Sequence, residues 1–462
     1  MASAASPAQS VGVRSPHPDR LPLTGADAFL LAFDAETRRR NQASHLSQIV
    51  LRLGPGFDAA AFERVLGEVA RANPIVRAPI RRRAGLGRPE YRLDLAARAP
   101  NPVFELHDAP APGDRGASAS LPPLFEARLN AKHSRERGGL LHVDAVRHTD
   151  GGTDLALTWL HMLLDGQGSE RFLEFLEACG TGRLAPHEVP AADRPDAPPD
   201  LALPAAQRER GEMAMAWQRR MSALGRLPVR SPSGPERGLR QRLVVDRVQL
   251  APELSAIATK RAALLAGFLT PMIFHLAAAI RAHDAVMRRR GPAPPSYVVP
   301  LPVNLRPKGA DGGIFRTRVS LLWFQVESPL VADLPALLAE LKAQRRRAIG
   351  QKMVENGVAA MEFARSAPSR LYGTMARRAL RGELCSFFFA YTGEFCPDLD
   401  RFFGAPVEDG FGVPSVPASP GSLLVLALRD GRLGWTHVRQ RDAFSADELV
   451  VFREQLERDL LG

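Results

Sequence analysis

The segment Trp159-Leu160-His161-Met162-Leu163-Leu164-Asp165-Gly166 decides how the rest of this sequence is interpreted. The apolar residues before His161 predict a buried strand, and the Asp-Gly pair predicts a turn into a helix over 168–178. A histidine at the end of a strand can act as a general base, because its ordinary pKa of about 6.5 suits proton removal at neutral pH. Asp165 either contacts His161 or fixes the loop by pairing with a cation elsewhere, and the pattern alone leaves both open. A core histidine followed by an ordinary Asp-Gly turn is the alternative interpretation.

The composition is that of an ordinary globular protein. The chain has 462 residues, of which 45% are hydrophobic and 24% are charged, which excludes a disordered chain and a collagen-like repeat. This length exceeds what one hydrophobic core usually supports, so two lobes are expected. The formal net charge of +11 is compatible with nucleic acid, an anionic membrane surface or a phosphate-bearing ligand. No nucleic-acid-binding motif accompanies the charge, so we predict no nucleic-acid partner.

Targeting and metal signals are missing from the sequence. Its three cysteines lack disulfide and metal-ligand spacing, so we predict no metal site and a reducing, cytoplasmic location. Residues 1–20 lack the apolar core of a signal peptide and are expected to form a disordered tail. The most apolar stretch, 264–280, is interrupted by Pro271 and His275 and is too short to span a bilayer. We therefore expect no transmembrane segment.

Strand and helix signals follow one another without a strict alternation, which predicts an α/β fold with mixed sheets. The disordered tail should be followed by an N-terminal lobe over 21–180, a proline-rich linker with a helix over 181–240, and a C-terminal lobe over 241–462. The expected strands cover residues 46–53, 75–83, 90–95, 140–147, 155–161, 242–250, 296–303, 319–326, 384–390, 423–428 and 432–438. The expected helices cover residues 57–73, 168–178, 205–224, 252–263, 271–289, 334–350 and 445–461. Asp58, Thr270 and Ser445 are predicted N-caps.

The central segment resembles the HHxxxDG signature of an acyltransferase superfamily. That superfamily includes nonribosomal peptide condensation domains, wax ester synthases, polyketide-associated acyltransferases and plant alcohol acyltransferases. Leu160 replaces the first histidine, and His161 matches the second, which is the catalytic base of the family. Other segments agree in the family's order: 21–24 (LPLT) with the opening of condensation domains, 70–77 (ARANPIVR) with the hPxLR turn, 299–306 (VPLPVNLR) with the strand of wax ester synthases, and 389–395 (FAYTGEF) with the fNYLGQF strand of peptide synthetases.

The resemblance implies two chloramphenicol-acetyltransferase-like lobes in a V, with a central substrate tunnel and His161 at its midpoint. An acyl thioester, on coenzyme A or on the phosphopantetheine arm of a carrier protein, would enter one mouth. An acceptor alcohol or amine would enter the other. A thioester is already activated, so the reaction needs a general base and an oxyanion donor but no tightly bound cofactor. Such an enzyme would belong to natural-product or lipid biosynthesis.

The resemblance also implies supporting roles for other residues. Asp165 would pair with Arg306, and Gly166 would allow a tight turn where a side chain would block the tunnel. Tyr391 and Thr392 lie in the matching tunnel strand and are candidate oxyanion donors. An acyl or peptidyl carrier protein is the expected partner. The alternative is a non-catalytic condensation-like module that docks carrier proteins or recruits a partner enzyme.

Overall fold

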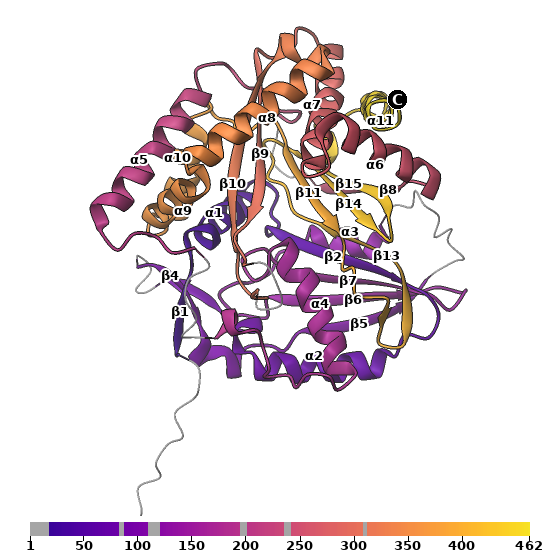
Figure 1. The fold of residues 1–462 in the computed structure, drawn as a ribbon. Coiled ribbons are helices and arrows are strands. Elements are labelled where there is room, and N and C mark those ends of the chain that lie inside the picture. Colours follow the sequence, from indigo (N-terminus) through magenta and orange to yellow (C-terminus); the bar gives the residue numbers. More distant parts are fainter. Residues whose placement is uncertain (1–17, 83–86, 110–120, 195–200, 235–241, 308–311) are drawn as a thin grey trace, which may run out of the picture.

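Two β-sheets form the centres of two lobes in the computed structural model (Figure 1). The structure describes residues 18–82, 87–109, 121–194, 201–234, 242–307 and 312–462. The strands of the first-lobe sheet, in spatial order, are β12 (Arg401–Phe402), β13 (Ala405–Val413), β2 (Leu46–Leu53), β7 (Thr153–Leu160), β6 (Leu141–Arg147) and β5 (Val103–Asp108). Only the β5–β6 pair among them is parallel. The predicted α/β fold with mixed sheets and two lobes is confirmed.

Helices cover both faces of the first sheet. The helices of this lobe are α1 (Gly25–Arg40), α2 (Ala59–Ala72), α3 (Pro123–Leu129) and α4 (Gly166–Gly180). The predicted N-cap Asp58 begins α2, where its side chain accepts a hydrogen bond from the backbone of Ala61. Every residue of β2 and β7 is buried, because helices and the second lobe leave neither face open to water. His161 thus follows a strand that packing holds firmly in place.

A second sheet and a long two-stranded ribbon organise the other lobe. The sheet contains, in spatial order, β11 (Phe388–Glu394), β14 (Ser422–Arg429), β15 (Arg432–Gln440) and β8 (Leu243–Gln249), and the ribbon pairs β9 (Ser296–Asn304) with β10 (Val319–Glu327). The helices of this lobe are α5 (Gln207–Leu224), α6 (Pro252–Ala266), α7 (Pro271–Arg289), α8 (Leu334–Gly350), α9 (Met353–Ala364), α10 (Ser369–Arg378) and α11 (Ala446–Leu461). The apolar helix α7 is buried along most of its length and forms the centre of this core.

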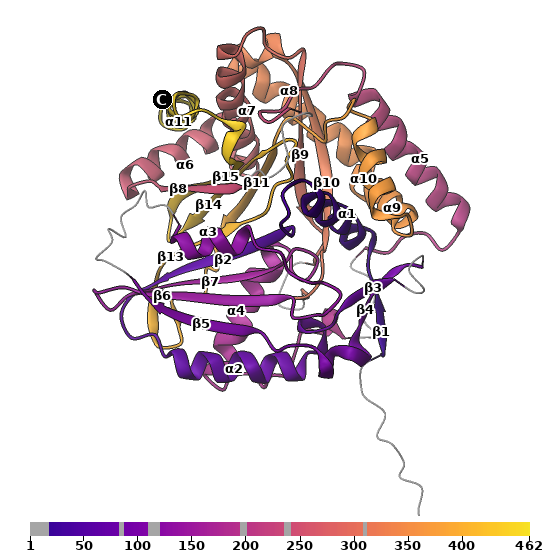
Figure 2. The same ribbon diagram turned by 180° about the vertical axis from the view of Figure 1, so that it is seen from behind.

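Each lobe contributes elements that pack into the other. Residues 401–413 leave the second lobe, and β13 pairs antiparallel with β2, as Figures 1 and 2 show. Without β13, β2 would be an edge strand with a row of unpaired backbone groups. The segment expected to be the C-terminal lobe, 241–462, therefore contributes two strands to the first sheet. Helix α1 of the first lobe packs in turn against α9 and α10.

Several local expectations need correction. The expected strand over 75–83 is a 3-10 turn (Pro74–Val76) followed by the short β3 (Ile80–Arg82), which pairs with β4 (Pro89–Arg92). Strand β1 (Arg20–Pro22) flanks β4 on its other side, so Arg20 is ordered, whereas the rest of the expected tail lies almost wholly outside the described residues. Thr270 occupies the N-cap position of α7 but donates its hydroxyl to the carbonyl of Ala266 instead of capping the helix.

Other local expectations are confirmed. Ser445 and Glu448 form a capping box at the start of α11, and Asp430-Gly431 forms the turn of the β14–β15 hairpin. Within the described ranges, no single helix is long and apolar enough to cross a membrane. Helices α6 and α7 pass such a test only when taken together, and they meet at an angle of 102°.

Candidate active site

Strand pairing fixes the position of His161. The register of the antiparallel pair β2–β7 places Leu46 opposite Leu160, and one further step places His45 opposite His161. The backbone N–H of His161 donates to the carbonyl of His45 over 3.2 Å. The side chain of His161 is partly exposed, whereas Leu160 and Met162 on either side of it are fully buried. The strand end therefore presents one imidazole at the margin of an otherwise closed core.

The surroundings of His161 select one tautomer of its ring. The Nδ1 atom lies 3.3 Å from the carbonyl oxygen of Leu164. A carbonyl can only accept a hydrogen bond, so Nδ1 carries the proton and Nε2 keeps a free lone pair. Burial lowers the pKa of His161 below its ordinary value. Hydrogen bonds between the ring and the backbone at Leu164 and His161 act in the opposite direction and raise this pKa, but the effect of burial is larger. The ring is thus neutral at pH 7, which is the state that a general base requires.

A second histidine, which sequence reasoning missed, stacks on the first. The ring centroids of His45 and His161 are 5.5 Å apart, and the angle between the two ring planes is 29°. Burial, together with the neighbouring His161, lowers the pKa of His45 well below its ordinary value. A neutral ring can support His161 without placing a second positive charge beside it. The sequence shows only that His45 directly precedes an expected strand, and the pairing of that strand with β7 comes from the structure.

Asp165 and Arg306 form the ion pair that the family resemblance implied. The Asp165 Oδ2 atom lies 2.8 Å from Arg306 Nη1, and both side chains are almost completely buried. The same oxygen accepts the backbone N–H of Arg318 at 2.8 Å, and Oδ1 caps helix α4 by accepting the N–H of Gly168. Both carboxylate oxygens of Asp165 thus bond to groups other than His161 and hold the loop in place, which favours the second of the two possibilities that the sequence left open.

The connection between β9 and β10, which belongs to the second lobe, contacts residues 161–166, the segment with the HxxxDG pattern. The backbone N–H of Arg316 donates to the carbonyl of Leu163 over 2.7 Å. Asp193, within the predicted linker, accepts backbone hydrogen bonds from Ile314 and Phe315 and pairs with Arg318 at 3.0 Å. Sequence reasoning missed Asp193, because a lone acidic residue in a proline-rich segment carries no local signal. These contacts fix the His161 loop relative to the second lobe.

The glycine that packing requires here is Gly168, not Gly166. A Cβ atom on Gly168 would lie 2.3 Å from the carbonyl oxygen of Ile314 and 2.9 Å from Arg306. A Cβ atom on Gly166 would meet nothing within 4 Å, and the backbone there does not adopt a left-handed conformation. The tight turn therefore does not need Gly166. Its role in keeping a tunnel open stays a prediction, as does the tunnel itself.

Strand β11 approaches the site through aromatic rings. Phe33 lies between His45 and Phe388, with ring centroids 5.6 Å and 6.1 Å away, respectively. Tyr391 faces the other way and packs against His275 in the second-lobe core, with ring centroids 4.8 Å apart. Thr392 is exposed. No hydrogen bond joins Tyr391 or Thr392 to His161 within the described part of the chain, and the orientation of Tyr391 argues against a role as oxyanion donor.

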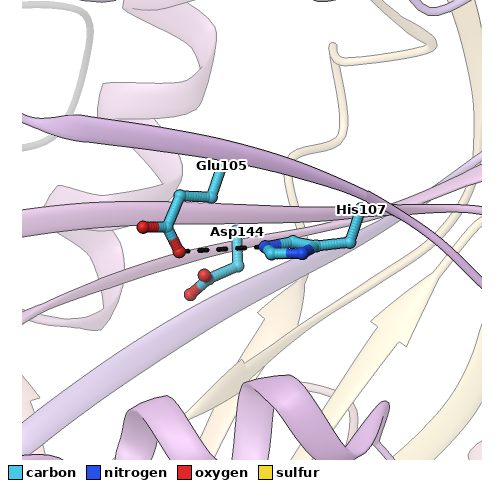
Figure 3. Close-up of side chains that lie close together, drawn as sticks. All are labelled: Glu105, His107 and Asp144. Atoms are coloured by element: carbon cyan, nitrogen blue, oxygen red, sulfur yellow. Dashed lines mark ion pairs between the residues drawn. The ribbon is translucent and has the colours of Figure 1, made fainter.

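One cluster has the residue types of a metal site. Glu105 and His107 on β5 lie beside Asp144 on β6, with candidate ligand atoms within 4.8 Å of one another (Figure 3). The guanidinium of Arg128, however, contacts Glu105 at 2.8 Å and Asp144 at 2.9 Å. Arg128 already supplies the positive charge that these two carboxylates need. We therefore assign no metal to this cluster.

No family model matches the chain, and no curated protein matches it by sequence. Solved structures do match. Trichothecene 15-O-acetyltransferase from Fusarium sporotrichioides has a TM-score of 0.68 at 15% identity, covering 96% of this chain and 95% of that chain. The first condensation domain of the calcium-dependent antibiotic synthetase has a TM-score of 0.65 at 17% identity, over 96% and 95%. The epimerization domain from the third module of tyrocidine synthetase B has a TM-score of 0.57 at 13% identity, over 96% and 97%.

These matches extend over nearly the whole of each chain. The protein therefore has the fold of condensation domains and related acyltransferases, as the sequence segments predicted. An epimerization domain shares this fold, so the fold alone does not fix the reaction. The reaction has to be argued from the side chains of the site.

Proposed function

We propose that this protein is an acyltransferase that moves an acyl group from a thioester donor to a hydroxyl or amine acceptor. The observation that carries the proposal is the state of His161. Its ring sits at the margin of the core with Nδ1 engaged by a carbonyl, which leaves Nε2 as the acceptor for a proton. Burial keeps the ring neutral at pH 7 by lowering its pKa. A similar fold in an O-acetyltransferase and in a condensation domain supports the same class of chemistry.

The proposed reaction needs no covalent enzyme intermediate. The Nε2 atom of His161 takes the acceptor proton as the acceptor oxygen or nitrogen attacks the thioester carbonyl. The tetrahedral oxyanion then collapses, the carbon–sulfur bond breaks, and the imidazolium returns its proton to the departing thiolate. Products are the ester or amide and the free thiol. Thr392, which is exposed on β11, is the remaining proposed oxyanion donor.

The donor is proposed to be an acyl phosphopantetheine thioester, which is common to coenzyme A and carrier proteins. Coenzyme A adds several phosphates and needs a compact group of cations, whereas a carrier protein offers an acidic helix and needs a broader basic surface. Helix α8 carries Arg345, Arg346 and Arg347 in one run, but Arg347 already pairs with Glu340. Because the segment 389–395 resembles the strand of peptide synthetases, we propose a carrier protein as the first donor to test, and the experiment has an arm for each source.

The test is transfer by the purified full chain, measured as release of free thiol. Acyl-coenzyme A and acyl-carrier proteins are offered in separate reactions with a panel of alcohols and amines. His161→Ala should abolish release while the melting temperature and donor binding are retained. The matched control is His107→Ala, which removes a half-exposed histidine from β5 and should leave turnover unchanged.

Each outcome has a defined meaning. Near wild-type turnover by the His161 variant would refute the general-base assignment. Turnover with acyl-coenzyme A at comparable efficiency would overturn the carrier-protein preference. Binding of a carrier protein without transfer across the acceptor panel would instead identify a non-catalytic docking module.

A further inference from the structure

Helix α6 has its large apolar residues on the wrong side for an ordinary surface helix. Its buried positions are small: Ser255, Ala258, Ala262 and Ala266. Its exposed face carries leucine and isoleucine, at Leu254, Ile257, Leu264 and Leu265. A surface helix normally turns its large apolar residues toward the core. Figures 1 and 2 show α6 at the periphery of the second lobe, and these four side chains are between 37% and 73% exposed.

The exposure is greatest where α6 ends and the chain turns into α7. Phe268 is 85% exposed and Leu269 is 87% exposed, and Leu264, one turn earlier, is 73% exposed. Gly267 provides the turn with a φ of +91°. Two neighbouring apolar side chains that are almost fully exposed form a protruding tip. We call residues 264–269 the apolar tip.

Positive charge accompanies the apolar tip. Lys342 of α8 donates to the carbonyl of Leu265 over 3.0 Å, which places its ammonium group beside the tip. A hollow of about 530 Å³ next to Phe268 is lined by Lys260 and Arg432, with Asp430 as its acidic member. The sequence contains no acidic residue from 254 to 283. The combination of an apolar tip and basic neighbours is complementary to a surface with an apolar interior and anionic headgroups.

We propose that the apolar tip docks this protein on an anionic lipid surface. Phe268 and Leu269 would enter the boundary between headgroups and acyl chains, while Lys260 and Lys342 remain at the level of the headgroup phosphates. This is peripheral attachment, because α7 is buried in the core of the second lobe. The proposal does not depend on the acyltransferase activity, since the tip belongs to the outer face of the second lobe and His161 to the end of β7.

The test is co-sedimentation of the full chain with vesicles of phosphatidylcholine, alone or with added phosphatidylglycerol. We expect binding to the anionic vesicles, weakened by added salt because exposed charges are screened. The variant F268S/L269S should bind at least about tenfold more weakly, because two apolar anchors are lost. Lys260→Glu should weaken binding to anionic vesicles selectively. The matched control is L371S/M375S, which removes two half-exposed apolar residues of α10 and should bind like the wild type.

A second measurement reports insertion directly. In Phe268→Trp, the new indole should be quenched by brominated acyl chains, whereas the same change at Met375 should give no additional quenching. Failure of the wild type to bind anionic vesicles, or equal binding by F268S/L269S, would overturn the proposal. A dimer in lipid-free solution that F268S/L269S converts to a monomer, without vesicle binding, would assign the tip to a second copy of this chain. Binding of an acidic carrier protein that requires the tip, again without vesicle binding, would also overturn the lipid assignment.

Discussion

Asp165→Ala should damage this protein far more than the loss of one small side chain suggests. The substitution removes hydrogen bonds from Arg306, Arg318 and Gly168, each 2.8 Å long. It also leaves the Arg306 guanidinium buried without its counter-charge. Breaking a buried ion pair on one side typically costs about 3–5 kcal/mol. For a lobe of this size, that corresponds to a fall in melting temperature of roughly 6–20 °C.

The partner substitution separates charge from helix capping. Arg306→Ala leaves the Asp165 carboxylate with two backbone N–H donors, from Gly168 and Arg318, so its cost should lie near the lower end of the same range, about 3 kcal/mol. The double variant should be less damaged than the sum of the two single variants, by about 0.5–3 kcal/mol, because each single variant strands a charge that the double variant removes.

The assay is thermal unfolding of all variants at one scan rate, because chains of this size often unfold irreversibly. The control is Arg208→Ala, which removes an exposed ion pair with Glu212. The Arg208 side chain is 91% exposed, so its loss should leave the melting temperature unchanged. Strictly additive losses in the Asp165 and Arg306 variants would refute the reasoning. Such a result would mean that the buried contact contributes nothing beyond the separate packing of the two side chains.

Three further outcomes concern helix α4, which contains Gly166, Gly168 and Glu170, and the candidate base His161. Gly168→Ala should lower the free energy of unfolding by about 1–3 kcal/mol, because the new methyl group would overpack against Ile314. Gly166→Ala should leave the melting temperature unchanged. A larger loss in the Gly166 variant would contradict the close contact between Gly168 and Ile314. Burial raises the pKa of Glu170 to about 8, so the folded state retains a proton that the unfolded state has lost, and the contribution of Glu170 to stability should fall as pH rises from about 4.5 to about 8. Below pH 6.5 the lowered pKa values of His45 and His161 act in the opposite direction. The measurement is therefore the difference in melting temperature between Glu170→Gln and the wild type, which should move in favour of the variant as pH rises toward 8. Acyl transfer should decline only below pH 6.5, because the lowered pKa of His161 keeps it neutral at higher pH; a midpoint above 6.5 would contradict this.

The segment that forms the candidate site could be located from the sequence because its signals are local. His161, Asp165 and the helix that follows lie within one short segment, and the strand before them is continuous and apolar. Arg306 is 141 residues from Asp165, and only the resemblance of its segment to a known motif indicated the pairing. The two lobes follow from chain length, since a core of this size has to divide.

The rest could not be predicted because it depends on contacts between distant segments. The pairing of β13 with β2 joins residues that are separated by most of the chain, and neither strand carries a local mark of its partner. The alternation of β11 places Ala390 and Tyr391 on opposite faces, but only the packing of the lobes shows which face meets His45 and His161. Gly166 and Gly168 differ in their surroundings: the loop that contains Ile314, from the other lobe, packs against Gly168 but not against Gly166.

These distant contacts hold the loop that follows the candidate base. The β9–β10 connection from the second lobe holds Leu163 through Arg316 and holds Asp165 through Arg306 and Arg318. Replacing a buried ion pair by apolar packing of equal volume is often neutral or stabilising, so we attribute to these contacts the geometry that they impose rather than net stability. Any movement between the lobes at this point would break a charged, buried contact. Strand pairing positions His161 itself, and the loop that follows it, from Leu163 to Asp165, is held by contacts with the second lobe.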